Sequence, residues 1–463
     1  MTTNRILSLE TSFCTLVLQA FLCLSSGTSV CAQTVQNHGI DGLVVQPGRP
    51  VALSLVGTLP AAFGKFFDLF PVEASENLTQ WTPLATVVRT NVTNDIIYLD
   101  VTAADQPIRF YRTPTNQFNT PFLAPTGPFT VGILSRMLTD PTRTNRYNIK
   151  TNSSFVVTFW YPAQSVAGQL PALYTDPKLA SYRPYWGTLT NVVPSFVSHA
   201  FPEAPIASGG DQYPIIIYTH GLADGISEGG TGGGVRGDNT ATAVELASYG
   251  YLVVAIDHID CYGTVFPDGT RVLRGFPFGN VLNESGRYLS SRFQDIQFIL
   301  GKLSQLAQTD PVFANRLDLN HVGIMGWSFG GGTAAEACRT NDQIKAAVLL
   351  DGYLDPVPVL SKGLQKPFLA MNSPSTGLAP SAMTLFSKAT NSACVLQIIN
   401  TQHETFIDQA WITEHTAATR LAAQAKNACV VSFFNRLFKN KDDHLLEAPT
   451  NQFANITGFH RKP

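Results

Sequence analysis

The stretch Val322-Gly323-Ile324-Met325-Gly326-Trp327-Ser328-Phe329-Gly330 decides the fold expected of this chain. Its first four residues are apolar or small, which predicts a short buried strand, and the small residues at 331–337 predict the start of a helix. A serine between such a strand and helix, with one glycine two positions before it and another two positions after, is the pattern of a nucleophile elbow. Side chains at the two glycines would collide with neighbouring backbone in so tight a turn. The pattern therefore predicts that Ser328 is a catalytic nucleophile.

Strands and helices alternate on both sides of this elbow. Short continuous apolar runs, typical of strands buried on both faces of a sheet, occur at 154–161, 215–218, 252–256, 322–325, 346–350 and 395–399. Helices are predicted at 289–306, where apolar residues share one face, and at 240–249, which closes on Gly250. This alternation over about 300 residues predicts an α/β fold: a doubly wound, mostly parallel sheet of the α/β-hydrolase type with right-handed crossovers.

The acid of a catalytic triad should follow the serine, because this fold carries its triad in the chain order Ser, Asp or Glu, His. The strand after the elbow ends in Leu349-Leu350-Asp351, so Asp351 is predicted at the carboxyl edge of the sheet, beside Ser328. Asp355 is the alternative acid. The next strand-like segment, 367–371, ends in Asn372-Ser373 and offers no acid.

The base is predicted in the same way from its position in the chain. His403 lies in a loop directly after the strand at 395–399, where the fold presents its histidine. Of the other histidines after Asp351, His415 falls in a helical run, and His444 and His460 belong to a polar tail. We therefore expect His403 to take the proton of Ser328.

Two backbone amides are predicted to form the oxyanion hole that a tetrahedral intermediate requires. One belongs to Phe329, directly after the nucleophile, and the other to Leu222, in Thr219-His220-Gly221-Leu222 after a buried strand. His220 is a possible base by residue type, but the chain order indicates that it shapes this loop. The glycine-rich residues 229–237 lack the Lys-Ser/Thr of a phosphate loop and are expected to form a lip near the pocket.

The N-terminal part of the chain has a different pattern. Residues 33–122 show short alternating apolar runs broken by Gly, Pro and Asn, which predict a small all-β unit, and the Pro- and Thr-rich stretch 114–128 predicts a boundary before a catalytic domain at 123–463. The segments Val72 to Leu84 and Arg109-Phe110-Tyr111-Arg112 resemble a β-sandwich-like module of secreted bacterial proteins. Its role is left open.

Residues 1–32 read as a secretory signal peptide. Arg5 precedes a charge-free apolar run from Ser12 to Leu24, and Val30-Cys31-Ala32 offers a cleavage site after Ala32. The run is short for a membrane span, which needs about 20 apolar residues, although a membrane anchor is the alternative. A secreted or periplasmic location is therefore expected.

Composition limits the partners and cofactors. The 463 residues are 44% hydrophobic and 14% charged with a formal net charge of -2, so we expect no nucleic-acid partner, and the short apolar run near the N-terminus gives no stable membrane span. Four cysteines remain after the leader, Cys261, Cys338, Cys394 and Cys429, and their spacing fits no metal site. Neither a metal nor a cofactor is expected. A Cys394–Cys429 disulfide and buried free thiols are both open.

Several segments together resemble the platelet-activating factor acetylhydrolase family of α/β-hydrolases, over about residues 126–437. They are Gly127-Pro128-Phe129-Thr130-Val131-Gly132, the segment 138–143, Phe159-Trp160-Tyr161-Pro162-Ala163, Thr219-His220-Gly221-Leu222, the segment 246–260, the elbow, and Leu350-Asp351-Gly352. The family's nucleophile, acid and base fall on Ser328, Asp351 and His403. The resemblance implies a calcium-independent esterase that removes short or oxidised acyl groups from phospholipids, and a structural or pocket-shaping role for Asp257 and His258.

Two departures keep other substrates open. The glycine-rich stretch after Leu222 looks like an insertion, and Trp327 stands where many family members have histidine. The elbow also resembles that of bacterial cutinases and polyesterases, so a polyester or triglyceride hydrolase is the nearest alternative. Those enzymes place their acid after the strand that here ends in Asn372-Ser373, which favours the acetylhydrolase relationship. A third reading is a surface-binding protein that uses the hydrolase fold as an inactive scaffold.

Overall fold

The structure, a computed structural model, describes most of the chain. The described residues are 20–23, 29–33, 38–45, 50–57, 68–89, 96–100, 103, 108–112, 120–145, 148–166, 169–176, 179, 196–208, 211–222, 234–258, 261, 263–266, 268–273, 285–355, 357–414 and 416–463. The chain divides into two units, Met1–Asn119 and Thr120–Pro463. The predicted limits of the two domains, 33–122 and 123–463, remain a prediction, as does the lip at 229–237, most of which lies outside the described residues.

The first unit consists of two β-sheets. One has the strand order β1-β2-β8-β5-β6 and the other β3-β4-β7. The bounds are Ala20–Cys23 for β1, Ser29–Gln33 for β2, His38–Val44 for β3, Val51–Gly57 for β4, Asp68–Ser75 for β5, Thr82–Arg89 for β6, Ile96–Asp100 for β7 and Ile108–Arg112 for β8. Leu53 and Leu55 of one sheet share a core with Val72 and Tyr111 of the other. The predicted all-β N-terminal unit is confirmed.

Part of the predicted signal peptide lies in this unit. Strand β2 pairs in parallel with β8, with Ala32 opposite Tyr111, and β1 pairs with β2. Cleavage after Ala32 would remove β1 and all of β2 except Gln33. The cleavage remains a prediction, and residues 1–19 and 24–28 lie outside the described residues. In the described part of the chain, no helix has the length and apolar character that crossing a membrane requires.

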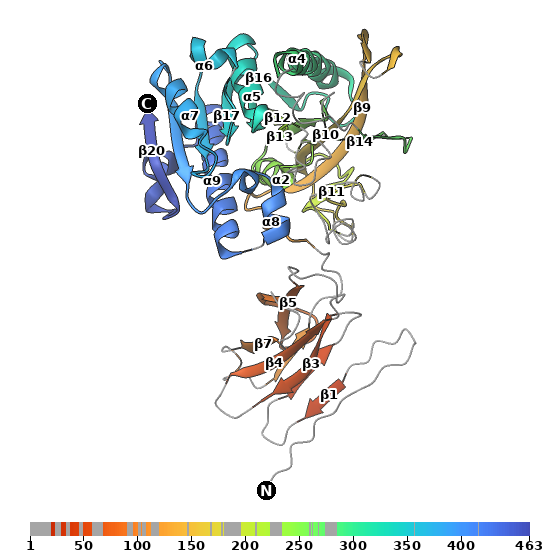
Figure 1. The fold of residues 1–463 in the computed structure, drawn as a ribbon. Helices are drawn as coiled ribbons and strands as arrows, with labels where there is room; N and C mark the ends of the chain where they lie inside the picture. Colours follow the sequence, from red (N-terminus) through yellow and green to blue (C-terminus); the bar gives the residue numbers. More distant parts are fainter. Residues whose placement is uncertain are drawn as a thin grey trace. The chain divides into compact units, whose positions relative to one another are not determined.

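The second unit is built on a ten-stranded sheet of order β11-β9-β10-β13-β12-β16-β17-β18-β19-β20 (Figure 1). The strands are Thr130–Asn145 (β9), Asn148–Ala163 (β10), Ala200–Pro202 (β11), Tyr213–Thr219 (β12), Leu252–Ile256 (β13), Leu317–Trp327 (β16), Ile344–Leu350 (β17), Phe368–Asn372 (β18), Ala393–Ile398 (β19) and Ile456–Lys462 (β20). A small hairpin, β14 (Gly263–Val265) and β15 (Arg271–Leu273), lies outside it. The six strands from β13 to β19 are parallel, whereas β10 and β20 join this block in antiparallel pairs. The predicted α/β-hydrolase class is confirmed.

Helices cover both faces of this sheet (Figure 1). One face packs against α4 (Ser285–Thr309), α5 (Phe329–Thr340), α6 (Pro358–Lys362) and α7 (Ala379–Ser387), and the other against α2 (Thr240–Ser248) and α9 (Ala417–Lys439). Helix α8, Asp408–Glu414, precedes α9. Strands β12 and β13 are buried along their whole length, as their continuous apolar sequences predicted. The parallel strands therefore end together at one edge, where the loops that carry the candidate site residues begin.

Candidate active site

Ser328 occupies a strained turn between β16 and α5. Its φ is 56° and its ψ −125°, a backbone conformation that residues other than glycine rarely adopt. Ser328 N donates to Leu350 O at 3.0 Å, and Ser328 O accepts from Tyr353 N at 2.8 Å. Strand β17 and the loop after it therefore hold the strained backbone in place.

The two glycines around Ser328 are required by close backbone packing. A Cβ at Gly326 would lie 2.1 Å from Gly330 O, and a Cβ at Gly330 would lie 2.1 Å from Thr219 O. Since no side chain fits at these distances, the turn can form only with glycine at both positions. Gly330 also lets the start of α5 approach the end of β12, where the predicted oxyanion loop begins.

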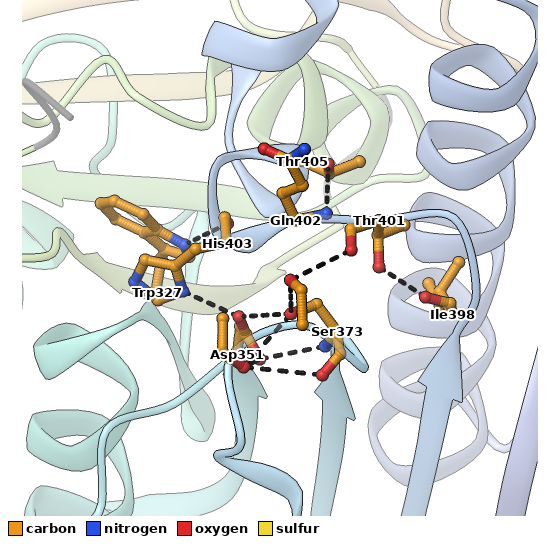
Figure 2. A network of polar contacts seen from close by, with 10 residues as sticks. Trp327, Asp351, Ser373, Ile398, Thr401, Gln402, His403 and Thr405 are labelled. Atoms are coloured by element: carbon orange, nitrogen blue, oxygen red, sulfur yellow. Dashed lines mark hydrogen bonds and ion pairs between the residues drawn. The ribbon is translucent and has the colours of Figure 1, made fainter.

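Asp351 and His403, which are far apart in the sequence, meet at the carboxyl edge of the sheet (Figure 2). His403 Nδ1 lies 2.7 Å from Asp351 Oδ2. The Asp351 side chain is fully buried, whereas 22% of the His403 side chain is exposed. A carboxylate can only accept from Nδ1–H, so Nε2 is the ring nitrogen left to accept a proton. In the described part of the chain, Ser328 Oγ forms no hydrogen bond with His403.

Two further residues, which the sequence analysis did not single out, hold the Asp351 carboxylate, and Figure 2 labels one of them, Ser373. Oδ1 accepts from Ser373 N at 3.0 Å and from Thr376 Oγ1 at 3.1 Å, and Oδ2 accepts from Ser373 Oγ at 3.2 Å. Ser373 directly follows β18, the strand next to β17. The segment that ends in Asn372-Ser373 offers no acid, but its last residue supplies two of the donors that orient the acid, and its position at the end of the neighbouring strand is the sequence signal for this role.

His403 is held from the side of the elbow by Trp327. The indole and imidazole centroids are 4.6 Å apart, and Trp327 Nε1 donates to His403 O at 2.9 Å. His403 also begins the 3₁₀ turn η4, His403–Phe406, in which Gln402 and Thr405 form a capping box. Lys426 Nζ, from α9, donates to Phe406 O at 3.3 Å. The base loop is thus fixed at both ends.

The alternative acid and bases lie elsewhere. Asp355 is exposed and outside the contacts around Asp351. His444 is exposed and pairs with Glu447, and His460 lies in β20 near Phe386. His415 lies outside the described residues.

The predicted oxyanion loop lies against the elbow. A Cβ at Gly221 would be 2.5 Å from the Trp327 ring and 3.3 Å from Ser328 Cβ. Leu222 therefore follows a residue that touches the elbow on the β12 side, and Phe329 follows Ser328 on the α5 side. Both residues thus directly follow a residue at the elbow, and the use of their amides as an oxyanion hole remains a prediction.

His220 is occupied within the protein. It is fully buried, and its Nε2 accepts from His258 N at 3.1 Å. Nδ1 is therefore the protonated nitrogen, and it lies 2.6 Å from Gly221 O. This geometry supports the prediction that His220 shapes the loop.

Asp257 and His258 also have partners inside the fold. His258 Nδ1 lies 2.9 Å from Asp295 Oδ2 and its Nε2 lies 2.9 Å from Thr219 Oγ1. Asp257 accepts from Arg236 N at 2.8 Å and pairs with the Arg236 guanidinium. Their buried pairings support the structural role that the family resemblance implied.

The described cysteines are buried. Cys338, Cys394 and Cys429 are free thiols in the structure, so the Cys394–Cys429 bridge, one of the two open expectations, is not formed. Burial raises the pKa of the Cys394 thiol to about 12. In the described part of the chain, Asp442, His444 and Glu447 lie close enough together to hold a metal ion, but all three are exposed, as acidic surface groups without an ion commonly are.

A cavity of about 700 Å³ lies over β9 and β10. Trp160, Arg236 and Val265 are among the residues that line it, and Ser328, Asp351 and His403 are not. The candidate catalytic residues therefore lie outside this cavity.

The comparison with known proteins assigns the chain to a family. Residues 115–266 and 305–433, more than half of the chain, match the family described as platelet-activating factor acetylhydrolase, isoform II. The chain belongs to this family. The match includes Ser328, Asp351, His403 and the predicted oxyanion loop, and it begins close to the start of the second unit.

The relatives that match this chain align with only part of it. The platelet-activating factor acetylhydrolase of Cavia porcellus is 26% identical over 48% of this chain and 55% of its own length, and that of Gallus gallus is 24% identical over 44% and 54%. The chain thus spans about half the length of the curated relatives it matches. A ferulic acid esterase from Streptomyces cinnamoneus has a TM-score of 0.58 and 24% identity and covers 73% of this chain and 98% of its own, which shows the α/β-hydrolase fold.

Proposed function

We propose that this member of the platelet-activating factor acetylhydrolase family is a serine carboxylic-ester hydrolase. The observation that carries the proposal is the 2.7 Å contact between His403 Nδ1 and Asp351 Oδ2 beside the strained turn of Ser328. The contact orients the imidazole with Nε2 free to accept a proton, and Trp327 fixes His403 next to the elbow. These are the groups that activate a serine for acyl transfer.

The proposed reaction has two halves. Ser328 Oγ attacks the ester carbonyl carbon while His403 Nε2 takes the hydroxyl proton, and the N–H groups of Phe329 and Leu222 donate to the oxyanion. His403 then returns the proton to the leaving alkoxide, which departs as an alcohol and leaves an acyl-Ser328. Water attacks this ester with His403 as base, and the acid is released as Ser328 recovers its proton. No cofactor enters any step.

The proposed substrate class is short or modified acyl esters of the phospholipid type. Family membership supports it, because the relatives are named as acetylhydrolases of platelet-activating factor. The position of the acid also favours this family over a cutinase or polyesterase, since Asp351 follows β17 and the end of β18 contributes Ser373 as a hydrogen-bond donor. A polyester or triglyceride hydrolase is the second candidate, suggested by the glycine-rich elbow.

Hydrolysis of p-nitrophenyl esters from acetyl to palmitoyl, together with a short-chain phospholipid, tests the proposal. The wild type should cleave the short esters and the phospholipid, and Ser328→Ala should lose at least about 10³-fold in kcat. Preference for long chains or polyester film would favour the second candidate. A fluorophosphonate probe should label the wild type but not Ser328→Ala. An unlabelled, inactive wild type would leave a non-catalytic scaffold as the remaining interpretation.

We also propose that the protein is exported and cleaved after Ala32. The apolar run and the Val30-Cys31-Ala32 site support this. Intact mass measurement of the protein recovered from the medium or periplasm should give a chain that begins at Gln33. A full-length chain that keeps β1 and β2 in the first unit would contradict the cleavage.

A further inference from the structure

We propose that Arg292 is a positioning residue that orients and polarises the Gly221–Leu222 peptide, so that Leu222 N–H is aimed at the oxyanion. The inference rests on the proposed function, in which this N–H is one of two oxyanion donors. It adds a residue on α4 that the triad and the family motif do not include.

Arg292, on α4, binds the proposed oxyanion loop. Its side chain is fully buried and reaches the loop with both terminal nitrogens. Nη1 donates to His220 O at 2.5 Å and Nη2 donates to Gly221 O at 2.8 Å. The planar guanidinium therefore holds two successive carbonyl groups in fixed directions, which a single ammonium group would do less rigidly.

The carbonyl of Gly221 and the N–H of Leu222 belong to one peptide group. A trans peptide is planar, and its C=O and N–H point in opposite directions. Fixing Gly221 O against Arg292 therefore fixes the direction of Leu222 N–H, away from α4. The positive charge at the oxygen end also draws electron density from the amide, which makes Leu222 N–H a stronger hydrogen-bond donor in a buried environment.

A second route from α4 reaches the same carbonyl. His220 Nδ1 donates to Gly221 O at 2.6 Å, and His258 N fixes the His220 ring by donating to its Nε2. His258 in turn pairs with Asp295 at 2.9 Å. Arg292 and Asp295 are one turn apart on α4, so a single helix orients this peptide through two converging contacts.

Arg292 also contacts the residue that bears the other proposed donor. The guanidinium carbon lies 5.0 Å from the centre of the Phe329 ring. One buried cation thus touches both sides of the proposed oxyanion hole, at Gly221 and at Phe329. This shared contact would keep the spacing between the two amides constant during turnover, as preorganised oxyanion stabilisation requires.

The test compares Arg292→Met and Arg292→Lys with a matched control, Lys439→Met. Lys439 is a half-buried cation that also donates to two successive carbonyls, Tyr249 O and Gly250 O, and it lies over the Tyr251 ring. Those contacts lie between the C-terminal end of α2 and the N-terminal end of β13, whereas His258 follows the C-terminal end of β13. The control therefore removes the same kind of interaction away from the site. Each variant is assayed with a p-nitrophenyl ester, and its unfolding is measured in urea.

The proposal expects kcat to fall by about 10- to 100-fold in Arg292→Met with KM changed by less than about 3-fold, because the loss is confined to the transition state. Arg292→Lys should have a kcat between those of Arg292→Met and the wild type, and Lys439→Met should keep the wild-type kcat. If Arg292→Met does not fold, Arg292→Lys carries the test, with a loss of about 3- to 10-fold expected.

Kinetics with a thionoester substrate give a measurement that a loss of stability alone would not change. The thionoester places sulfur, a weak acceptor, where the oxyanion forms, so a well-aimed donor favours the oxygen ester. The ratio of kcat/KM for the oxygen ester to that for its thionoester should fall in both Arg292 variants. Folded variants with wild-type kcat and an unchanged ratio would overturn the inference. Absence of Ser328-dependent activity in the wild type would instead overturn the proposed function.

Discussion

The indole of Trp327 lies against the imidazole of His403, with ring centroids 4.6 Å apart, and its Nε1 donates to the backbone oxygen of the same histidine at 2.9 Å. Trp327 directly precedes Ser328, so the contact links the elbow to the loop that carries the proposed base. The resemblance to relatives with histidine before the serine had marked this position as a departure. The structure gives the tryptophan a role that a smaller ring would fill less completely.

Trp327→Phe should lower kcat by about 3- to 10-fold, because the ring contact is kept while one hydrogen bond, worth about 1 kcal/mol, is lost. Trp327→Leu should lower it further, since the imidazole then loses the aromatic surface as well. Steady-state kinetics with a p-nitrophenyl ester measure both. Trp160→Phe is the control, because Trp160 Nε1 is buried without a partner in the described part of the chain. Equal losses at both positions would contradict a specific role of Trp327.

Thr376→Val should destabilise the protein and lower kcat. The threonine hydroxyl donates to Asp351 Oδ1, and a hydrogen bond to a charged group contributes about 1.5–3 kcal/mol. The free energy of unfolding in urea and kcat should both fall, whereas Thr384→Val should leave kcat unchanged, because that hydroxyl bonds only Pro380 O of its own helix. A Thr376→Val variant with wild-type kcat would show that Ser373 alone orients the acid.

Gly330→Ala should destabilise the protein by about 3 kcal/mol or more, or prevent folding. The new Cβ would lie 2.1 Å from Thr219 O and 2.5 Å from His220 O, and backbone atoms cannot move aside as a flexible side chain can. Gly301→Ala is the opposite case. Gly301 is exposed within α4 and has nothing within 4 Å of the added carbon, so alanine should stabilise by about 1 kcal/mol. Urea unfolding of both variants tests this contrast.

Asp408→Asn should change how stability depends on pH. Burial raises the pKa of Asp408 to about 7 from 3.8, with the charges of Lys426 and Asp238 acting in opposite directions. The folded state therefore holds this proton more tightly than the unfolded chain, and the corresponding stability is complete below pH about 4 and lost as the pH rises toward 7. Between pH 4.5 and 6.5 the wild type should lose stability relative to Asp408→Asn in urea unfolding. A difference that is constant with pH would rule this out.

Cys394 and Cys429 should resist alkylation in the folded protein. Both thiols are buried, and burial raises the pKa of each, so the reactive thiolate is scarce. In the absence of a reductant, iodoacetamide should modify both thiols only after the protein has been unfolded in denaturant. Peptide mapping detects the modified cysteines. Peptides linked by a disulfide would show that the pair is oxidised in the purified protein.

The local pattern around Ser328 was sufficient to predict the elbow, because the steric demand of a strand-to-helix turn falls on residues within two positions of the serine. The same holds for the buried strands, whose continuous apolar runs reflect burial on both faces. Asp351 and His403 could be placed because this fold keeps a fixed chain order. Their neighbours could not, since Ser373, Thr376 and Trp327 act through contacts across strands and loops that no local pattern encodes.

Arg292 shows most clearly where the sequence stops being informative. By itself the sequence determined the fold class, the elbow and the order of the candidate triad. The fold class follows from the hydrophobic pattern, the elbow from local sterics, and the order of the triad from the order in which this fold carries its catalytic residues. An arginine in the middle of an amphipathic helix reads as a solvated charge. Only the tertiary structure decided that it is buried against His220 O and Gly221 O, because that contact depends on how α4 packs against the end of β12.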